Sequence, residues 1–273
     1  MMPDQVKFEH LARFGYAARG IVYVLVGGMA LLSSVGGGRT DQESALKMVL
    51  DQPLGWIWLG LIGLGLIGFI VWRLAQALLN ADGHPDDAKG YLIRGGMLIS
   101  AITYTGLAAY AIQNALQLSL GGGSDNSRET WIAWLMQQPF GRFLIAAIGL
   151  ATIGAGAAQI IKGLRRRYLK YVAISPDQNR VLDLACVYGL AARGVVFLII
   201  GSFFIYAGWA SDAGQTGSTA EAMAWVRQLP FGGLLYAFIA LGLFAFGAYG
   251  LIEARYRTVR SPALSEAKRG LMA

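Results

Sequence analysis

The sequence has little charge and almost no cysteine or histidine. Asp, Glu, Lys and Arg make up 14% of its 273 residues, against roughly 25% in an ordinary soluble domain. The one cysteine, Cys186, excludes an internal disulfide and a metal site built from several thiolates. The two histidines, His10 and His84, both fall in polar segments, so no histidine cluster is available for a metal or a buried proton relay. We therefore expect no metal, and the shortage of charge favours a membrane protein.

Hydrophobic residues are abundant instead, at 55%, and they gather in six stretches. Each stretch is about the ~20 residues that a helix needs to cross a bilayer, and a continuous helix satisfies its own backbone polar groups in lipid. The longest polar segment between them, 162–183, is too short for a soluble domain, so we expect a single membrane domain over residues 1–273. The six spans are predicted near residues 16–35, 54–72, 95–118, 143–161, 184–209 and 231–252.

The chain repeats one pattern three times, with two spans in each repeat. A fixed period of this kind identifies a repeat architecture. Because each repeat has an even number of spans, successive repeats enter the membrane in the same direction, which predicts parallel repeats around a pseudo-threefold axis. The repetition also argues that the first span is a permanent helix and not a cleaved signal peptide. The first helix of each repeat carries one of the dipeptides Arg19-Gly20, Ser100-Ala101 and Arg193-Gly194. The turn before the second helix contains Pro53, Pro139 or Pro230. The repeats cover about 12–79, 91–164 and 185–257.

Basic residues are concentrated on one side of the predicted spans. If the N-terminus is cytoplasmic, 18 of the 23 Lys and Arg residues lie on the inner side, and the positive-inside rule then places both termini in the cytoplasm. Six of the seven tryptophans fall at the outer boundary, which aromatic residues prefer. We interpret the formal charge of +7 as a topology signal with affinity for anionic lipid. No nucleic-acid recognition module accompanies it, so nucleic acid is not an expected partner.

Each outer loop carries a helix-start signal before its proline. A capping side chain followed three residues later by an acid satisfies the first amides of a helix, and apolar residues at helical spacing follow. We predict three short amphipathic helices lying flat on the outer surface, as interfacial packing or as a gate or docking surface. The signals are Thr40 with Glu43, Asn126 with Glu129, and Ser218 with Glu221.

Two sets of residues are candidates for packing and for binding. Small residues on the second helix of each repeat let helix backbones approach closely in lipid. The predicted packing residues are Gly60, Gly63, Gly68, Gly154 and Gly247. Polar residues near the cytoplasmic ends of the spans form a predicted collar, which comprises Arg19, Arg73, Gln76, Arg94, Gln159, Lys162, Arg193 and Glu253. Two interpretations of the collar remain open. It is either a set of snorkelling side chains and structural ion pairs, with Glu253 as the acidic partner, or a site for an anionic head group or small anion.

With the repeat laid out, the chain resembles bacterial six-span membrane proteins built from three copies of the "domain of unknown function 1206". The resemblance covers about residues 12–257, and the middle copy departs from it with Ser100-Ala101. It implies a bacterial cytoplasmic membrane and a six-helix fold, and it supplies no activity. The matching residues are Arg13, Gly15, Tyr16, Ala18, Arg19, Gly20, Tyr23, Tyr188, Gly189, Ala191, Ala192, Arg193 and Gly194.

Three functional hypotheses follow from the sequence. The first is a non-enzymatic protein that binds lipid or serves as an accessory subunit, with anionic lipids as partners and protein partners or self-association as further options. The second is a conduit for a small solute or anion with the basic collar at its inner mouth, which requires a wet cavity past Arg73. The third, a lipid-modifying enzyme, lacks a catalytic cluster. We therefore expect neither an enzyme nor a cofactor.

Overall fold

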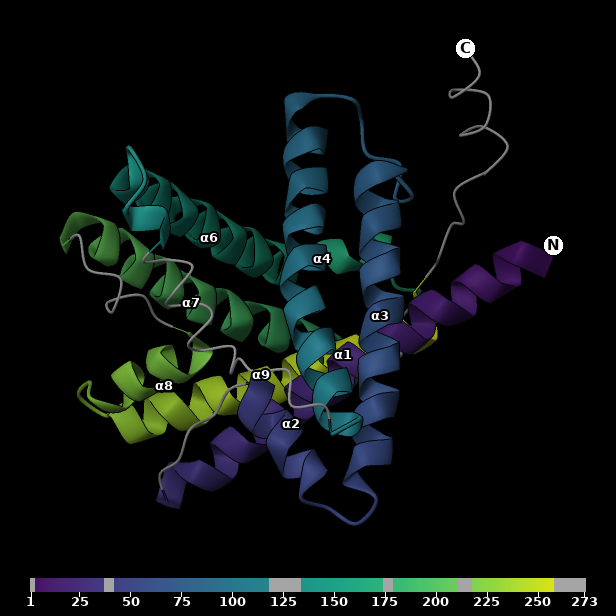
Figure 1. Cartoon of the computed structure of the whole chain (residues 1–273), viewed down its shortest axis with the longest axis horizontal. Coiled ribbons are helices and arrows are strands. Elements are labelled where there is room, and N and C mark those ends of the chain that lie inside the picture. Colours follow the sequence, from purple (N-terminus) through teal and green to yellow (C-terminus); the bar gives the residue numbers. More distant parts are fainter. Residues whose placement is uncertain (1–2, 37–41, 118–133, 174–178, 211–217, 258–273) are drawn as a thin grey trace.

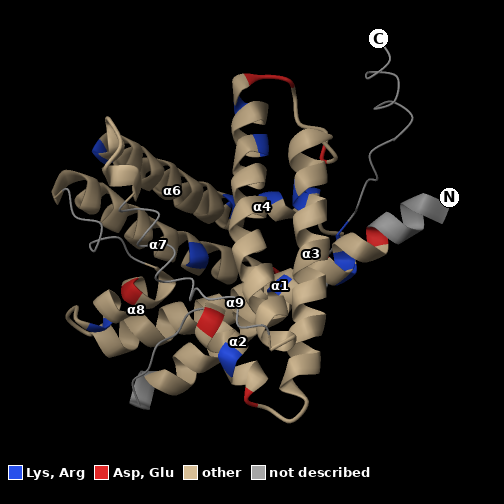
Figure 2. Cartoon of the chain, viewed as in Figure 1, with Lys and Arg blue, Asp and Glu red and all other residues tan. Residues whose placement is uncertain are grey.

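The chain is a bundle of long helices with short helices in its loops (Figure 1). The computed structural model describes residues 3–36, 42–117, 134–173, 179–210 and 218–257. Within these residues six helices are long and apolar enough to cross a membrane, which confirms the six predicted spans. They are α1 (Pro3–Gly36), α3 (Gly55–Leu78), α4 (Ala88–Ala115), α6 (Gly141–Leu164), α7 (Arg180–Ala210) and α9 (Gly232–Tyr256). Figure 2 shows that these long helices carry few charged residues along their length.

The three proline turns have the same backbone geometry. In each turn the residue after the proline adopts the left-handed conformation, with φ of 58° at Leu54, 64° at Phe140 and 59° at Phe231. The glycine that follows begins α3, α6 or α9, and a Cβ there would collide with a carbonyl oxygen of the preceding turn. Only glycine fits such a position. The Pro-x-Gly pattern is therefore a structural requirement repeated three times.

Two of the three predicted amphipathic helices lie within the described residues. They are α2 (Gln42–Leu50), which packs against α1, α3 and α4, and α8 (Thr219–Arg227), which packs against α7 and α9. At the start of α8 the Ser218 amide donates to the Glu221 carboxylate at 2.7 Å, as the sequence pattern predicts. Thr40 and the segment with Asn126 and Glu129 lie outside the described residues.

The spans associate as three antiparallel pairs, each made by the second helix of one repeat and the first helix of the next. The pairs are α3 with α4, α6 with α7, and α9 with α1, and Figure 1 shows them fanning out from one another. Glycines bring the backbones together: a Cβ on Gly156 would lie 2.7 Å from the Gly194 carbonyl oxygen, and one on Gly247 would lie 2.8 Å from that of Gly20. Close approach of this kind is typical of helices in lipid.

Contacts within a repeat join these pairs into an incomplete ring. Helix α1 packs on α3 in the first repeat, and α7 packs on α9 in the third. The equivalent helices of the second repeat, α4 and α6, have no comparable packing between them. The three-repeat architecture is thus confirmed, and its order of neighbours is that of a threefold ring open between α4 and α6.

Candidate functional site

A buried ionic cluster lies between α1, the last turn of α9 and the loop 79–87. We call this end of the bundle, which also holds residues 165–173, the termini side. Its centre is Glu253, in the last turn of α9. The Arg19 guanidinium of α1 lies 2.7 Å from Glu253 Oε2, and both side chains are 3% exposed. On the other oxygen, Arg257 Nη1 and the Tyr249 hydroxyl each donate at 2.8 Å. Tyr249, Glu253 and Arg257 are spaced by four residues, so they share one helix face.

Asp82 extends the cluster from the loop after α3. Arg257 Nη2 lies 3.1 Å from Asp82 Oδ2, and Gln76 Nε2 donates to the same oxygen at 2.6 Å. Gln76 in turn accepts from Arg73 Nη1 at 3.0 Å. The side chains of Gln76 and Arg257 are almost completely buried. One hydrogen-bonded chain therefore ties α1, α3 and the end of α9 together.

Aromatic rings surround the guanidinium groups. Arg19 lies 5.0 Å from the centre of the Phe69 ring and 5.2 Å from that of Phe246. Arg257 lies 5.0 Å from both the Tyr16 and Tyr171 rings. Such contacts hold a cation in an apolar surrounding, where it has lost most of its water.

The segment after α6 closes the cluster from the termini side. Its short helix η1 (Arg167–Lys170) buries Tyr168, whose hydroxyl donates to the Asp183 carboxylate. Burial, reinforced by this hydrogen bond, raises the pKa of Tyr168. Burial alone lowers the pKa of Arg257, but the facing Tyr16 hydroxyl and the Glu253 and Asp82 carboxylates outweigh it and raise that pKa. Arg257 therefore stays a cation at the covered centre of the cluster.

Positive charge exceeds negative charge in this cluster. The carboxylates of Glu253 and Asp82 pair with Arg19 and Arg257. Two further cations have only neutral hydrogen-bond partners in the described part of the chain: Arg73 donates to Gln76, and Lys162 donates to the Tyr249 hydroxyl at 3.0 Å. The Nε atom of Arg73 is buried without a hydrogen-bond partner. Arg73 and Lys162 are half-buried, and a cation that has lost part of its water without gaining a carboxylate partner favours an additional anion.

The structure brings five of the eight predicted collar residues into this cluster: Arg19, Arg73, Gln76, Lys162 and Glu253. Arg193 and Gln159 form a separate pair at 3.1 Å, with the Arg193 guanidinium 4.5 Å from the Phe246 ring centre. The collar predicted from the sequence does not include three residues of the cluster, Tyr249, Asp82 and Arg257. The four-residue spacing around Glu253 indicates Tyr249 and Arg257, whereas no local pattern indicates Asp82, which reaches the cluster only through the fold.

Arg94 has a different role from the other collar residues. Its guanidinium donates to the Ala77 and Leu78 carbonyl oxygens at the end of α3, at 2.8 and 3.2 Å. Arg13, at the equivalent position of the first repeat, donates to the Ala254 and Arg255 carbonyl oxygens at the end of α9. Both arginines satisfy carbonyl groups that a helix end leaves without partners.

The glycines predicted to pack between helices differ in their surroundings. Gly63, Gly68 and Gly247 lie where an added Cβ would come within 3 Å of a neighbouring helix. At Gly60 the nearest atom would be 3.7 Å away, an ordinary contact. Gly154 has no atom within 4 Å of the Cβ position, because none of the described helices packs on that face of α6.

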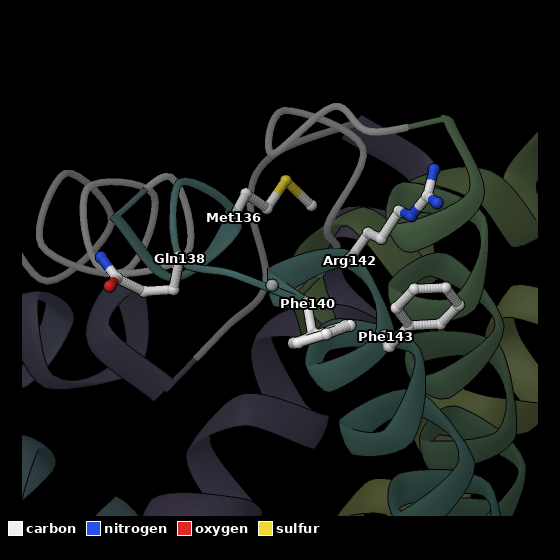
Figure 3. Close-up of a pocket in the computed structure, with 6 residues that line it drawn as sticks. Met136, Gln138, Phe140, Arg142 and Phe143 are labelled. Carbon is white, nitrogen blue, oxygen red and sulfur yellow. The ribbon is translucent and has the colours of Figure 1, made fainter.

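Polar residues outside the cluster occur at one pocket and in the second half of the loop after α3. A pocket of about 340 Å³ at the proline turn before α6 is lined by Met136, Gln138, Phe140, Gly141, Arg142 and Phe143. Figure 3 shows Arg142 and Phe143 side by side at the start of α6. In the loop after α3, Asp87 caps α4 through the Gly90 amide at 2.6 Å, and Asp86 lies 3.6 Å from Arg94. Among the described residues no group of three His, Cys, Asp or Glu side chains is placed to hold a metal.

Comparison with known proteins agrees with the repeat structure. The family described as "Domain of Unknown Function (DUF1206)" matches three times, at residues 14–80, 95–166 and 188–257. The chain is also 32% identical over 254 residues to the "Uncharacterized protein YxxB" of Bacillus subtilis (strain 168), with 91% of each chain covered. No solved structure matches. These matches carry no assigned activity. The chain therefore belongs to the DUF1206 family and is a multi-pass membrane protein built from three tandem copies of that domain.

Proposed function

We propose that the protein is a non-enzymatic binding protein of the bacterial cytoplasmic membrane, whose buried cluster holds the phosphate of an anionic lipid head group. In this proposal the termini side faces the cytoplasm, as the distribution of basic residues predicts. The anionic lipid of that leaflet then lies at the level of the cluster. The protein needs no cofactor for this role.

The surplus of positive charge supports the proposal most directly. Arg73 and Lys162 are the two cations of the cluster without a carboxylate partner in the described residues. Phosphate oxygens accept charge-assisted hydrogen bonds from Arg and Lys, and Arg suits phosphate especially well. A lipid phosphodiester carries one negative charge and would offset part of this surplus. Inorganic phosphate has the same chemistry, so the test must separate it from a lipid.

The conduit hypothesis gains no comparable support. It requires a wet cavity past Arg73, but the Arg73 guanidinium lies 4.8 Å from the Phe69 ring centre, and the neighbouring Gln76 is fully buried. Packing of this kind beside Arg73 does not support the passage that a conduit requires. We therefore advance only the binding function.

The first experiment measures which lipids the protein retains. The protein is purified in mild detergent and analysed by native mass spectrometry, both as wild type and as the variant R73A/K162A. The matched control is R165A/R167A, which removes two exposed basic groups from the same side. We expect the wild type and the control to retain anionic phospholipid, and R73A/K162A to lose most of it.

A second arm separates lipid from free phosphate. Thermal stability is followed as either anionic phospholipid or inorganic phosphate is added. Stabilisation by phospholipid alone, dependent on Arg73 and Lys162, supports a lipid site, while equal stabilisation by phosphate indicates a site for the free anion. If R73A/K162A retains as much anionic lipid as R165A/R167A does, the proposed function is wrong.

A further inference from the structure

The first and third repeats are held together by the same contact. Gly15 of α1 lies against the backbone of α3 at Phe69, and Gly189 of α7 lies against that of α9 at Phe246, so closely that a Cβ would collide with either backbone. Each glycine precedes the repeat arginine by four residues. The same pairing recurs in the side chains: the Arg19 guanidinium lies over Phe69 and the Arg193 guanidinium lies over Phe246.

The second repeat has lost this contact. Its equivalent glycine, Gly96 of α4, has no atom within 4 Å of the Cβ position, and neither has Gly154 of α6. Where the other repeats have arginine it has Ser100, and where they have phenylalanine it has Ala155. Two large side chains are therefore missing from the space between α4 and α6.

Two further residues prevent α4 and α6 from closing in the same way. In the first repeat a Cβ on Gly65 would collide with the Ala18 side chain, and in the third a Cβ on Gly242 would collide with that of Ala192. The second repeat has larger residues at both positions of this crossing, Ala151 and Ile99, and Ile99 is 63% exposed. The larger side chains therefore disfavour the tight crossing here, whether α6 comes from the same chain or from a second copy.

We propose that the opening between α4 and α6 admits a phospholipid from the bilayer, with its acyl chains between the two helices and its phosphate at the cationic cluster. The inference rests on the proposed function. It specifies that the ligand is a phospholipid of the bilayer and that it enters laterally between α4 and α6. Lys162 places one unbalanced cation of the cluster on α6 itself, at the termini side. Because the opening lies beside a surplus of positive charge, it favours an anionic lipid over a second copy of the chain.

Ser100 is the position that reports on this opening. A fluorophore on S100C, in a C186S background, would lie between α4 and α6. The control is I102C: two residues along a helix turn the side chain to the opposite face, and Ile102 is 66% exposed. Labelled proteins are reconstituted in vesicles with brominated phospholipids, which quench on contact. One series carries bromine on anionic lipid and the other on zwitterionic lipid.

We expect quenching at S100C with a preference for anionic lipid on the order of tenfold, which R73A/K162A abolishes and R165A/R167A leaves unchanged. The I102C label should be quenched without preference. An unquenched S100C label would overturn the inference, because protein would then fill the opening, and intermolecular S100C to A155C cross-linking would identify a second copy. Quenching at S100C without head-group preference, in a protein that still retains anionic lipid, would also overturn it but leave the proposed function standing. Quenching at S100C in a protein that retains no anionic lipid would refute the proposed function and with it the phosphate site, and would show only that lipid fills the opening.

Discussion

Neutralising Glu253 is the sharpest test of the buried cluster. In E253Q the Arg19 guanidinium, 3% exposed, loses its carboxylate partner, and Arg257 keeps only Asp82. Removing one partner of a buried ion pair costs about 3–5 kcal/mol, because the other charge stays buried. The control is E9Q, which breaks an ion pair with Arg13 whose side chains are 29% and 25% exposed. Pairs that accessible to solvent contribute about 0–1 kcal/mol.

The assay is equilibrium unfolding in mixed micelles, followed by circular dichroism. E253Q should lower the free energy of unfolding by several kcal/mol more than E9Q. The double variant R19M/E253Q should recover part of the loss, because it removes the stranded cation as well. Equal effects of E253Q and E9Q, or strictly additive effects of R19M and E253Q, would refute the reasoning that the cluster is a coupled, buried network.

Three further predictions use the same unfolding assay unless stated otherwise. G15A and G189A should each lower the free energy of unfolding by about 1–3 kcal/mol, since a Cβ collides with the backbone of α3 or α9. G96A, at the equivalent open position of the second repeat, should be neutral or slightly stabilising. A lower free energy of unfolding in G96A would show that another segment covers α4 there. R94A should cost about 0.5–1.5 kcal/mol by leaving the carbonyl groups of Ala77 and Leu78 without a donor, and should speed hydrogen exchange in the loop 79–87, whereas unchanged exchange would contradict the capping role. Because the pKa of Tyr168 is raised above its ordinary value, the stability it contributes is present below about pH 10 and is lost as pH rises further; Y168F should therefore lose stability less steeply than wild type between about pH 10 and 12, and parallel curves would refute this.

The sequence predicted the architecture well, because its signals are local and repeated. Apolar length gives the six spans, and the Pro-x-Gly pattern, shared by Pro53, Pro139 and Pro230, identifies the three equivalent turns. The predicted collar drew on local signals in the same way, since Arg73 and Gln76 are three residues apart on one helix face. Asp82 shows the limit of this reasoning. It lies in the loop 79–87 among other polar and turn-forming residues, and only the packing of α9 beside that loop brings it to Arg257.

The opening between α4 and α6 follows from selective changes in the second repeat. A repeat that had lost its packing in general would have changed on all sides. Its outward contacts are instead retained: Gly156 still approaches Gly194, and Gly149 approaches Gly201, with added Cβ atoms 2.7 Å from a carbonyl oxygen in both cases. The differences fall at the opening between α4 and α6, where Ser100 and Ala155 stand in place of an arginine and a phenylalanine. Lys162 of this same repeat reaches the cluster with its two unbalanced cations. The opening therefore lies beside the surplus of positive charge. A ligand with acyl chains and a phosphate would fill the opening and offset part of that charge.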